Sequence, residues 1–444
     1  MSAQPSTREL YDRYIIPTYG RFDLRLARGQ GTRVWDEDGR AYLDFGAGIA
    51  VTSIGHCHPR VVQAMQTQIG QLVHTSNLYY TRPQALLAQR LVRLVGAPGK
   101  VFFCNSGAEA NEALFKLARK FGNECASPSP RHTVGEAVQH EAYRHGILTM
   151  TGSFHGRTLG GISATGQDKV KKGFEPMVQG FSHVPFNDGP ALLGAVQDSG
   201  TVAVLLEPVQ GESGINPASA DFLRHARDLC DRHALLLMFD EVQCGLGRTG
   251  DWCGWKTLLG DGDVMPDAVS WAKGIAGGFP LGAIWVSDRQ VTLKSGGSVA
   301  LCDLLGPGSH GTTFGGTPLV CAGANEVLAV IEEERMLENA RVVGAHAIEK
   351  LRLLDSPLIK EVRGVGLMLG IELAADFSAK VNVAGRSPSL FLVEALHMAG
   401  LLTVPSGTHA IRWLPPLNVS REEIDEAVEI LRGVLSRCAT TVAS

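Results

Sequence analysis

The chain has 444 residues, which is enough for two or three domains of ordinary size around a large hydrophobic core. Its formal net charge of -4 gives no basic surface, so we expect no nucleic-acid partner. Nine cysteines without a Cys-x-x-Cys pair, no signal-like N-terminus and no apolar run of about 18 residues favour a cytoplasmic protein that does not span a membrane.

The first 95 residues predict a short β-structure followed by helix. Residues 31 to 51 form two strand-like runs around a turn at Asp36 to Gly39, and residues 60 to 95 have helical apolar spacing. Between them, His56 and His58 flank Cys57. Such close neighbours rarely converge on one ion, so we interpret them as a loop and expect no metal site.

Strands and helices alternate from residue 100. A strand over Lys100 to Asn105 leads into a helix over Ala108 to Phe121. Further apolar runs lie at 147–151, 201–206, 235–240, 268–272 and 282–286. Several of these runs are apolar without alternation, which is typical of a sheet that is covered on both faces. The pattern predicts an α/β fold with a mostly parallel, doubly covered sheet.

The pattern changes near residue 315. A helical stretch over 318–352 precedes a strand at 361–373, a helix at 389–399, a strand at 410–414 and a final helix from residue 421. We therefore expect an N-terminal segment over 1–65 that packs with a small C-terminal domain over 316–444, and a large domain over 66–315. Residues 123–143 and 288–309 read as surface insertions.

The segment from Asn105 to Glu112 lies where a strand meets a helix. A helix N-terminus offers free N–H groups and a positive dipole end, which suit a phosphate, and Gly107 permits close approach. An ordinary strand–helix turn with a polar cap fits the same residues equally well.

Asp240 and Lys273 each end an apolar strand, at the sheet edge where open α/β sheets bind ligands. Pyridoxal phosphate needs such a pair, because a lysine holds it as a Schiff base and an acid partners its pyridine nitrogen. Gln243 could reach the ring's phenolic oxygen. Taken singly, Asp240 also fits a structural carboxylate and Lys273 a solvent-exposed amine.

Two further motifs follow strands. In Ser153 to Thr158, Phe154 could stack on a ring and Arg157 could grip a carboxylate, although a core phenylalanine and a surface arginine fit as well. We interpret His155 as structural. Residues 245–250 match Gly-x-Gly-x-x-Gly, but no helical spacing follows them, which disfavours a dinucleotide site.

Together these motifs resemble the class III, fold type I pyridoxal-phosphate aminotransferases, most closely their acetylornithine branch. The resemblance covers about residues 14 to 432. The matching segments are 17–24, 42–58, 74–80, 105–112, 154–158, 207–212, 240–243, 272–280 and 310–316. It implies a large domain with a mostly parallel seven-stranded sheet covered by helices, plus a smaller α+β domain. It also implies a homodimer with active sites at the interface.

The resemblance implies cofactor roles for several residues. Lys273 would hold the cofactor and shuttle the proton, and Asp240 would face the pyridine nitrogen. Gly107 and Ala108, with Ser106 beside them, would bind the phosphate, Phe154 and Val242 would cover the two ring faces, Gln243 would reach the phenolic oxygen, and Thr313 would come from the partner subunit.

It implies substrate roles for others. Arg157 would clamp the substrate carboxylate, Thr312 would lie nearby, and Arg412 would bind a second carboxylate or pair with Glu212. Ile49, where ornithine aminotransferases tend to have tyrosine, suits an acylated α-nitrogen, and Gly274 also favours the acetylornithine branch.

The substrates implied are small amino acids and 2-oxo acids. The expected reaction converts N2-acetyl-L-ornithine and 2-oxoglutarate into N-acetyl-L-glutamate 5-semialdehyde and L-glutamate, in arginine biosynthesis. The alternatives are ornithine, succinylornithine or 4-aminobutyrate as amino donor. From another enzyme class, an NAD-binding oxidoreductase could use the glycine motif at 245–250.

Overall fold

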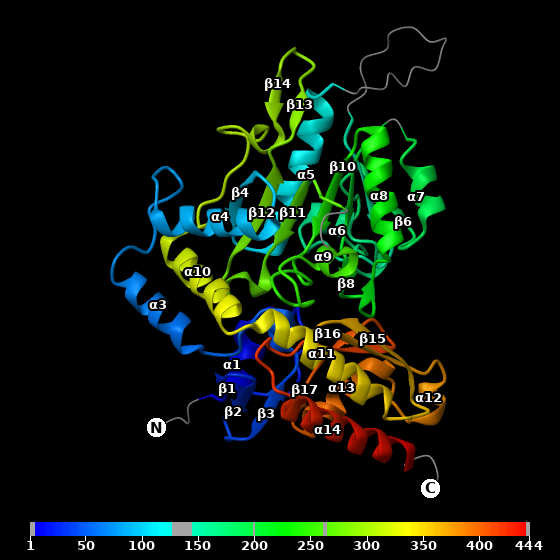
Figure 1. Cartoon of the computed structure of the whole chain (residues 1–444). Helices are drawn as coiled ribbons and strands as arrows, with labels where there is room; N and C mark the ends of the chain where they lie inside the picture. The colour runs from blue at the N-terminus through cyan, green and yellow to red at the C-terminus, as the bar shows by residue number, and fades with distance from the viewer. Residues whose placement is uncertain (1–4, 127–143, 199, 261–263, 441–444) are drawn as a thin grey trace.

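The computed structural model describes residues 5–126, 144–198, 200–260 and 264–440, so most of the expected insertion at 123–143 lies outside the described residues. The chain forms two lobes (Figure 1). The upper lobe holds a large sheet between helices. The lower lobe combines the N-terminal strands with the C-terminal part of the chain. Of the described helices, none has the length and apolar character needed to cross a membrane.

A seven-stranded sheet forms the centre of the upper lobe. Its strand order is β4 (Gly99–Cys104), β12 (Gly282–Ser287), β11 (Ala268–Trp271), β10 (Leu236–Asp240), β7 (Thr201–Leu206), β5 (Gly146–Met150) and β6 (Phe181–Val184). β12 runs antiparallel to both of its neighbours and the other pairs are parallel. The predicted α/β fold with a mostly parallel sheet is therefore confirmed. The sequence did not indicate the edge strand β6, which has only four residues.

Helices cover both faces of this sheet. Leu236 and Met238 of β10 pack in one hydrophobic cluster with α5 (Gly107–Glu124). Leu237 and Phe239, the alternate residues, pack in another cluster with α8 (Ala220–His233). Since successive side chains of a strand point to opposite faces, an apolar run without alternation is what two covered faces require.

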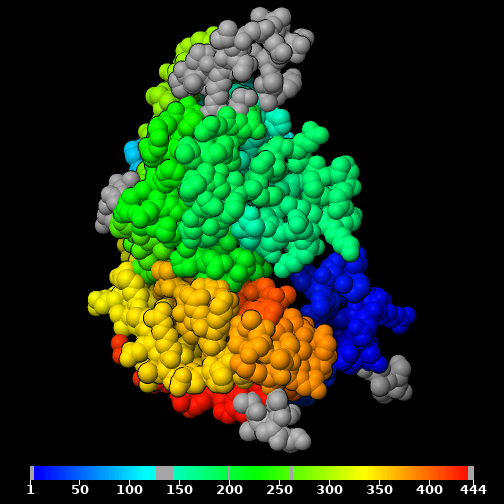
Figure 2. Space-filling view, turned by 90° about the vertical axis from the view of Figure 1, so that its right-hand side faces the viewer, coloured from blue at the N-terminus to red at the C-terminus, as the bar shows by residue number. Residues whose placement is uncertain are grey.

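The lower lobe contains two small sheets. The first is antiparallel and has the order β15 (Ile359–Val365), β16 (Met368–Leu373), β19 (Ala410–Trp413) and β18 (Val404–Ser406). The second joins β1 (Leu26–Gln30), β2 (Arg33–Asp36) and β3 (Ala41–Asp44) to β17 (Leu401–Leu402). The N-terminal segment, blue in Figure 2, therefore lies beside the C-terminal part of the chain. The exact three-part division at residues 65 and 315 stays a prediction.

The remaining elements connect or cover these sheets. The helices are α1 (Thr7–Tyr14), α2 (Ala47–Ala50), α3 (Pro59–Ile69), α4 (Arg82–Val95), α6 (Leu159–Ala164), α7 (Gly189–Ala195), α9 (Gly254–Leu259), α10 (Pro318–Glu333), α11 (Met336–Arg352), α12 (Phe377–Lys380), α13 (Pro388–Met398) and α14 (Arg421–Thr440). The short strands are β8 (Val209–Gln210), β9 (Asn216–Pro217), β13 (Gln290–Thr292) and β14 (Ser298–Ala300). The 3₁₀ turns are η1 (Asp168–Val170), η2 (Lys273–Ala276) and η3 (Leu301–Asp303).

Three expected elements are divided in the structure. The helical stretch 60–95 is two helices, α3 and α4, with residues 70–81 between them. The stretch 318–352 is also two helices, because Arg335 adopts a left-handed conformation with φ of 55°. The strand at 361–373 is a hairpin of β15 and β16 that turns at Gly366, where φ is 56°. Apolar spacing continues across each break, so periodicity alone did not reveal it.

Candidate active site

One cavity of about 440 Å³ lies at the carboxyl ends of the central strands. Asp240 is the last residue of β10, Glu207 follows β7, and Lys273 begins η2 after β11. The predicted residues that line this cavity are Ser106, Gly107, Ala108, Phe154, Arg157, Asp240, Val242, Gln243 and Lys273. The topology of the sheet thus brings together nine residues from four separate stretches of the chain.

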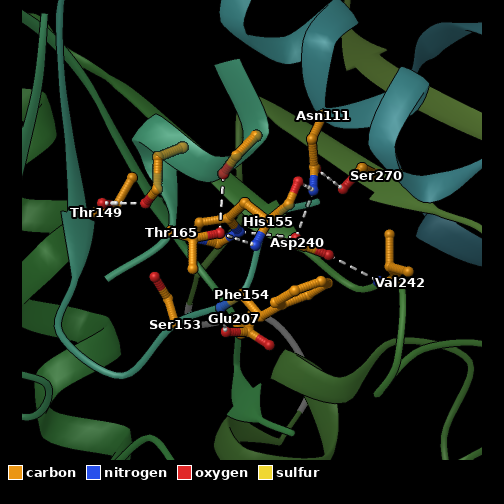
Figure 3. A network of polar contacts seen from close by, with 12 residues as sticks. Asn111, Thr149, Ser153, Phe154, His155, Thr165, Glu207, Asp240, Val242 and Ser270 are labelled. Carbon is orange, nitrogen blue, oxygen red and sulfur yellow. Dashed lines mark hydrogen bonds and ion pairs between the residues drawn. The ribbon is translucent and has the colours of Figure 1, made fainter. Parts of the chain in front are cut away.

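Asp240 is buried within a polar network (Figure 3). Its Oδ2 accepts hydrogen bonds from Asn111 Nδ2 at 2.7 Å and from His155 Nδ1 at 2.8 Å. Its Oδ1 accepts one from the Val242 N–H at 3.0 Å. An ionised carboxylate has about four acceptor sites, so these three bonds stabilise the charge and leave one site for a donor in the cavity.

The sequence did not indicate the contacts of Asp240 with Asn111 and with His155, which was interpreted as structural. Asn111 is itself fixed, because Ser270 Oγ donates to its Oδ1 at 2.7 Å and it also donates to the His155 carbonyl at 3.0 Å. His155 Nε2 is buried and has no partner among the described residues. We therefore place its proton on Nδ1, which donates to Asp240. Both residues stand inside predicted motifs, but no spacing rule connects them to Asp240.

Lys273 combines backbone strain with a perturbed amine. Its φ is 45°, in the left-handed region that a side chain with a Cβ rarely adopts. Burial, reinforced by the nearby charge of Arg412, lowers the pKa of its amine to about 8. A lower pKa increases the neutral fraction at physiological pH, and only the neutral amine is nucleophilic.

Glu207 differs from Asp240 although both are buried carboxyl groups beside the cavity. Its Oε2 accepts one hydrogen bond from the Phe154 N–H at 3.0 Å. Burial, and then the charge of Asp240, raise its pKa well above the ordinary value. A raised pKa favours the protonated form of Glu207, which limits the negative charge beside Asp240.

The N-terminus of α5 also lines the cavity. Ser106 caps this helix by accepting from the Glu109 N–H at 3.2 Å. The N–H groups of Gly107 and Ala108 have no hydrogen-bond partner within the part of the chain that the structure describes. A Cβ added at Gly107 would come within 2.8 Å of Val242 Cγ1, so only glycine fits here. Two free N–H groups at a helix N-terminus form an anion site.

These groups fit pyridoxal phosphate. The cavity offers an amine on Lys273, a carboxylate with a vacant acceptor site on Asp240, and two free backbone N–H groups for a phosphate. Phe154 and Val242 supply flat and apolar surface between them. Each of these groups matches a chemical feature of the cofactor, and each comes from a different element of the fold.

Arg412 forms an ion pair with Glu212 and also contacts Gln243. Arg412 Nη2 forms an ion pair with Glu212 Oε1 at 2.8 Å, and Arg412 Nη1 donates to Gln243 Oε1 at 3.2 Å. Burial raises the pKa of Glu212, but the charges of Arg412 and Lys273 and the hydrogen bond from Arg412 act together against it, and the net pKa is lowered. A carboxylate that entered from the cavity would compete with Glu212 for the same guanidinium.

Arg157 lines the cavity at its rim, and the remaining predicted residues lie outside its walls. Arg157 is exposed at the rim, with Cζ 5.5 Å from the centre of the Phe154 ring. Thr312 Oγ1 accepts from Asn105 Nδ2 at 3.1 Å, just outside the cavity. Thr313 is exposed and faces another part of the surface. Ile49 lines a neighbouring cavity of about 730 Å³.

The glycine motif at 245–250 packs against the C-terminal part of the chain. Arg248 Nη1 donates to the carbonyl of Leu367 at 3.1 Å, and a Cβ at Gly247 would come within 2.8 Å of Leu417. These contacts join the turn to the C-terminal part of the chain. The motif is occupied by protein packing, which agrees with the interpretation that it is not a dinucleotide site.

Comparison with known proteins gives a consistent result. The family model of aminotransferase class-III matches residues 15–435. The acetylornithine aminotransferase of Synechocystis sp. is 42% identical over 96% of this chain and 92% of its own length. The N-acetylornithine aminotransferase structure from Stenotrophomonas maltophilia has a TM-score of 0.75 at 33% identity, covering 97% of this chain and 98% of that one.

A second similar structure is that of an enzyme named for a different substrate. The ornithine aminotransferase of Toxoplasma gondii has a TM-score of 0.84 at 29% identity, covering 98% of this chain and 95% of that one. It is described with partial occupancy of pyridoxal phosphate at its active site. Relatives of both substrate types therefore share this fold.

Proposed function

Because the chain belongs to the class-III aminotransferases, enzymes that use pyridoxal phosphate, we propose that it transfers the terminal amino group of N-acetylornithine to 2-oxoglutarate. The products are N-acetylglutamate semialdehyde and glutamate, and the place of the reaction is arginine biosynthesis in the cytoplasm. The carrying observation is that Lys273, Asp240 and the N-terminus of α5 line one cavity, in a chain 42% identical to an acetylornithine aminotransferase.

Each residue has a defined task in this proposal. Pyridoxal phosphate, when bound, supplies an electron sink for the carbon that loses a proton. Lys273 would hold the cofactor, and its amine would move the proton at that carbon. Asp240, fixed by His155 and Asn111, keeps the ring nitrogen protonated. Phe154 and Val242 exclude water from the ring faces, and Arg157 at the rim orients the substrate carboxylate.

We further propose that the active enzyme is a homodimer in which Thr313 serves the partner's cavity. Thr313 is exposed beside an apolar surface, which consists of Leu78, Tyr79, Tyr80 and Phe314. Asn77 joins the two parts of this surface, since its Nδ2 donates to the Gly315 carbonyl at 3.0 Å. A contiguous apolar surface of this kind favours association, and a second copy would supply the phosphate contact that Thr313 does not make within one chain.

Ornithine is the second candidate donor, since ornithine aminotransferases share the fold. Ile49 favours N-acetylornithine, because an apolar side chain suits a neutral acylamino group better than a free ammonium group.

A donor titration tests the proposal. The purified holoenzyme is mixed with N-acetylornithine, ornithine, succinylornithine or 4-aminobutyrate in turn, and the visible absorbance of the Lys273-bound cofactor is followed. We expect N-acetylornithine to bleach it at the lowest concentration, with 2-oxoglutarate restoring it. Earlier bleaching by another donor would overturn the substrate. A protein that stays colourless after addition of pyridoxal phosphate would overturn the cofactor site.

A further inference from the structure

The chain makes a left-handed turn between β3 and the catalytic region. The four residues Ala47, Gly48, Ile49 and Ala50 have φ values of 45°, 63°, 64° and 63°. Positive φ is a genuine outlier for a β-branched residue such as Ile49, because the branched side chain crowds the backbone. Four consecutive residues stay in this region only if their surroundings hold them there.

The carboxylate of Asp44 is the group that holds this turn. Asp44 is buried, and its Oδ1 accepts from the N–H of Gly46 at 3.1 Å and of Ala47 at 2.8 Å. Its Oδ2 contacts His56 Nε2 at 2.8 Å. A Cβ at Gly29 would come within 2.6 Å of the His56 ring, so the strand β1 leaves room for that ring only because it has glycine there.

The turn separates two cavities. Val51, directly after it, lines the cavity of Lys273. Gly46, Gly48 and Ile49 line the neighbouring cavity of about 730 Å³, together with Asp44. Ser53 Oγ donates to the carbonyl of Gly274 at 3.0 Å, which fixes the distal end of the turn next to the catalytic lysine.

The start of the turn is fixed to the lobe that carries Arg412. The Phe45 N–H donates to the Leu402 carbonyl at 2.9 Å, and the Leu414 N–H donates to the Phe45 carbonyl at 2.7 Å. Leu414 lies two residues after Arg412 in the chain. These hydrogen bonds therefore fix the position of Ile49 relative to both Lys273 and Arg412.

We propose that Asp44 is a positioning residue that selects the amino donor, because it holds the left-handed turn that presents Ile49 to the second cavity. This inference rests on the proposed function. A donor whose amino group reacts at Lys273 extends past Val51, and its far end meets Ile49. An apolar side chain held there favours a donor whose far amino group is acylated and uncharged over one with a free ammonium group.

The hairpin between β2 and β3 provides a matched control. Asp36 Oδ1 accepts from two backbone N–H groups, of Asp38 at 3.1 Å and Arg40 at 2.8 Å, and its Oδ2 accepts from the Tyr42 hydroxyl at 2.8 Å. The bonding pattern is that of Asp44, but this turn lines neither cavity. Asp36→Ala therefore removes the same kind of turn support away from the substrate.

The experiment compares kcat/KM for N-acetylornithine and for ornithine, at saturating 2-oxoglutarate, in the holoenzymes Asp44→Ala, Ile49→Ala, the double variant and Asp36→Ala. We expect Asp44→Ala and Ile49→Ala each to lower the ratio of the two constants by about tenfold, and Asp36→Ala to leave it unchanged. In the Ile49→Ala background, Asp44→Ala should not lower the ratio further, because both changes remove one interaction.

Equal loss with both donors, or a full further loss of selectivity in the double variant, would overturn the positioning role. If Asp44→Ala does not fold, Asp44→Leu keeps the volume of the buried side chain and removes the oxygen that accepts from the Gly46 and Ala47 N–H groups. A reduced ratio then supports the role and an unchanged ratio overturns it. Failure of the proposed function would be seen separately, as wild-type enzyme that prefers another donor. The ratio is then taken with that donor.

Discussion

At the residue scale, two buried carboxyl groups of the site have different hydrogen-bond partners. Asp240 accepts three hydrogen bonds, from Asn111, His155 and the Val242 N–H, which stabilise its charge. Glu207 accepts one good bond and lies beside the charge of Asp240, so its pKa is raised. Neighbouring strand ends thus carry one carboxylate with three donors and one carboxyl group whose protonated form is favoured.

This difference predicts different responses to amide substitution. Asp240→Asn should lower kcat by about a hundredfold or more, because the ring nitrogen loses its anionic partner. Glu207→Gln should change kcat by no more than about threefold, since glutamine resembles a protonated glutamate. Single-turnover rates with N-acetylornithine, followed through the cofactor absorbance, measure both. Equal losses would contradict the assigned charges.

The ion pair of Arg412 with Glu212 predicts an effect on the second substrate. Glu212→Gln should lower the KM for 2-oxoglutarate severalfold, because the carboxylate that competes for the guanidinium becomes neutral. Arg412→Lys should raise the same KM, because lysine lacks the planar fork that holds a carboxylate at two points. Steady-state kinetics at fixed donor concentration would test both, and a KM unchanged in both variants would exclude Arg412 as a substrate contact.

Some residues of the site could be predicted from the sequence and others could not. Lys273 and Asp240 could be proposed from the residues alone, because both end apolar strands and strand ends meet at one edge of the sheet. The partnership of Arg412 with Glu212 came only from the family resemblance, since 200 residues separate them. His155 and Asn111 were not proposed, because their contact with Asp240 depends on how α5 packs on the sheet.

At the element scale, the short helix α9 depends on a buried glutamate. Glu241 accepts from the N–H of Gly254 at 2.7 Å and of Trp255 at 3.0 Å, at the helix N-terminus. Burial raises the pKa of Glu241 to about 8, against an ordinary value of 4.5. Folding therefore favours its protonated form.

A pH dependence of stability follows. Below pH 4.5 Glu241 is protonated in both the folded and the unfolded chain. As the pH rises from 4.5 towards 8, the unfolded chain releases the proton first, so the free energy of unfolding falls, by about 5 kcal/mol for the full shift. Urea unfolding between pH 5 and 8 should show this fall in the wild type and a flatter curve in Glu241→Gln.

Glu9 supplies the control for that measurement. It caps the exposed helix α1 by accepting from the Ser6 N–H at 2.7 Å, and this bond lowers its pKa. Its contribution to stability is therefore constant above pH 5, and Glu9→Gln should keep the wild-type slope. A Glu241→Gln curve as steep as that of Glu9→Gln would show that another group causes the fall.

The elements themselves were predictable where local pattern and tertiary packing agree. The strands β5, β7, β10, β11 and β12 were all expected, because burial on both faces requires a continuous apolar run. The division of 318–352 at Arg335 was not, since α10 and α11 each bury an apolar face and the spacing continues across the break. A single residue in the left-handed region leaves no trace in periodicity.

At the scale of the whole molecule, the proposed dimer accounts for the place of Thr313. The cavity of Lys273 has the N–H groups of Gly107 and Ala108 for a phosphate, while Thr313 faces another surface next to Phe314. The apolar side chains of Leu78, Tyr80 and Phe314 are exposed beside it, with Leu78 84% exposed. A symmetric dimer that buries this surface would place each threonine at the partner's cavity, since a two-fold interface uses the same surface twice.

Mixing two inactive variants tests this arrangement. Lys273→Ala lacks the amine, and Thr313→Asp repels a phosphate, so each homodimer should be inactive. When the two are unfolded and refolded together in equal amounts, half of the dimers are mixed. Each mixed dimer has one cavity with Lys273 from one chain and Thr313 from the other, so about a quarter of the wild-type activity should return. If Thr313 instead served its own chain, every cavity in the mixture would carry one defect and no activity would return. Refolding each variant alone supplies the control, and wild-type protein treated in the same way sets the yield against which the quarter is judged.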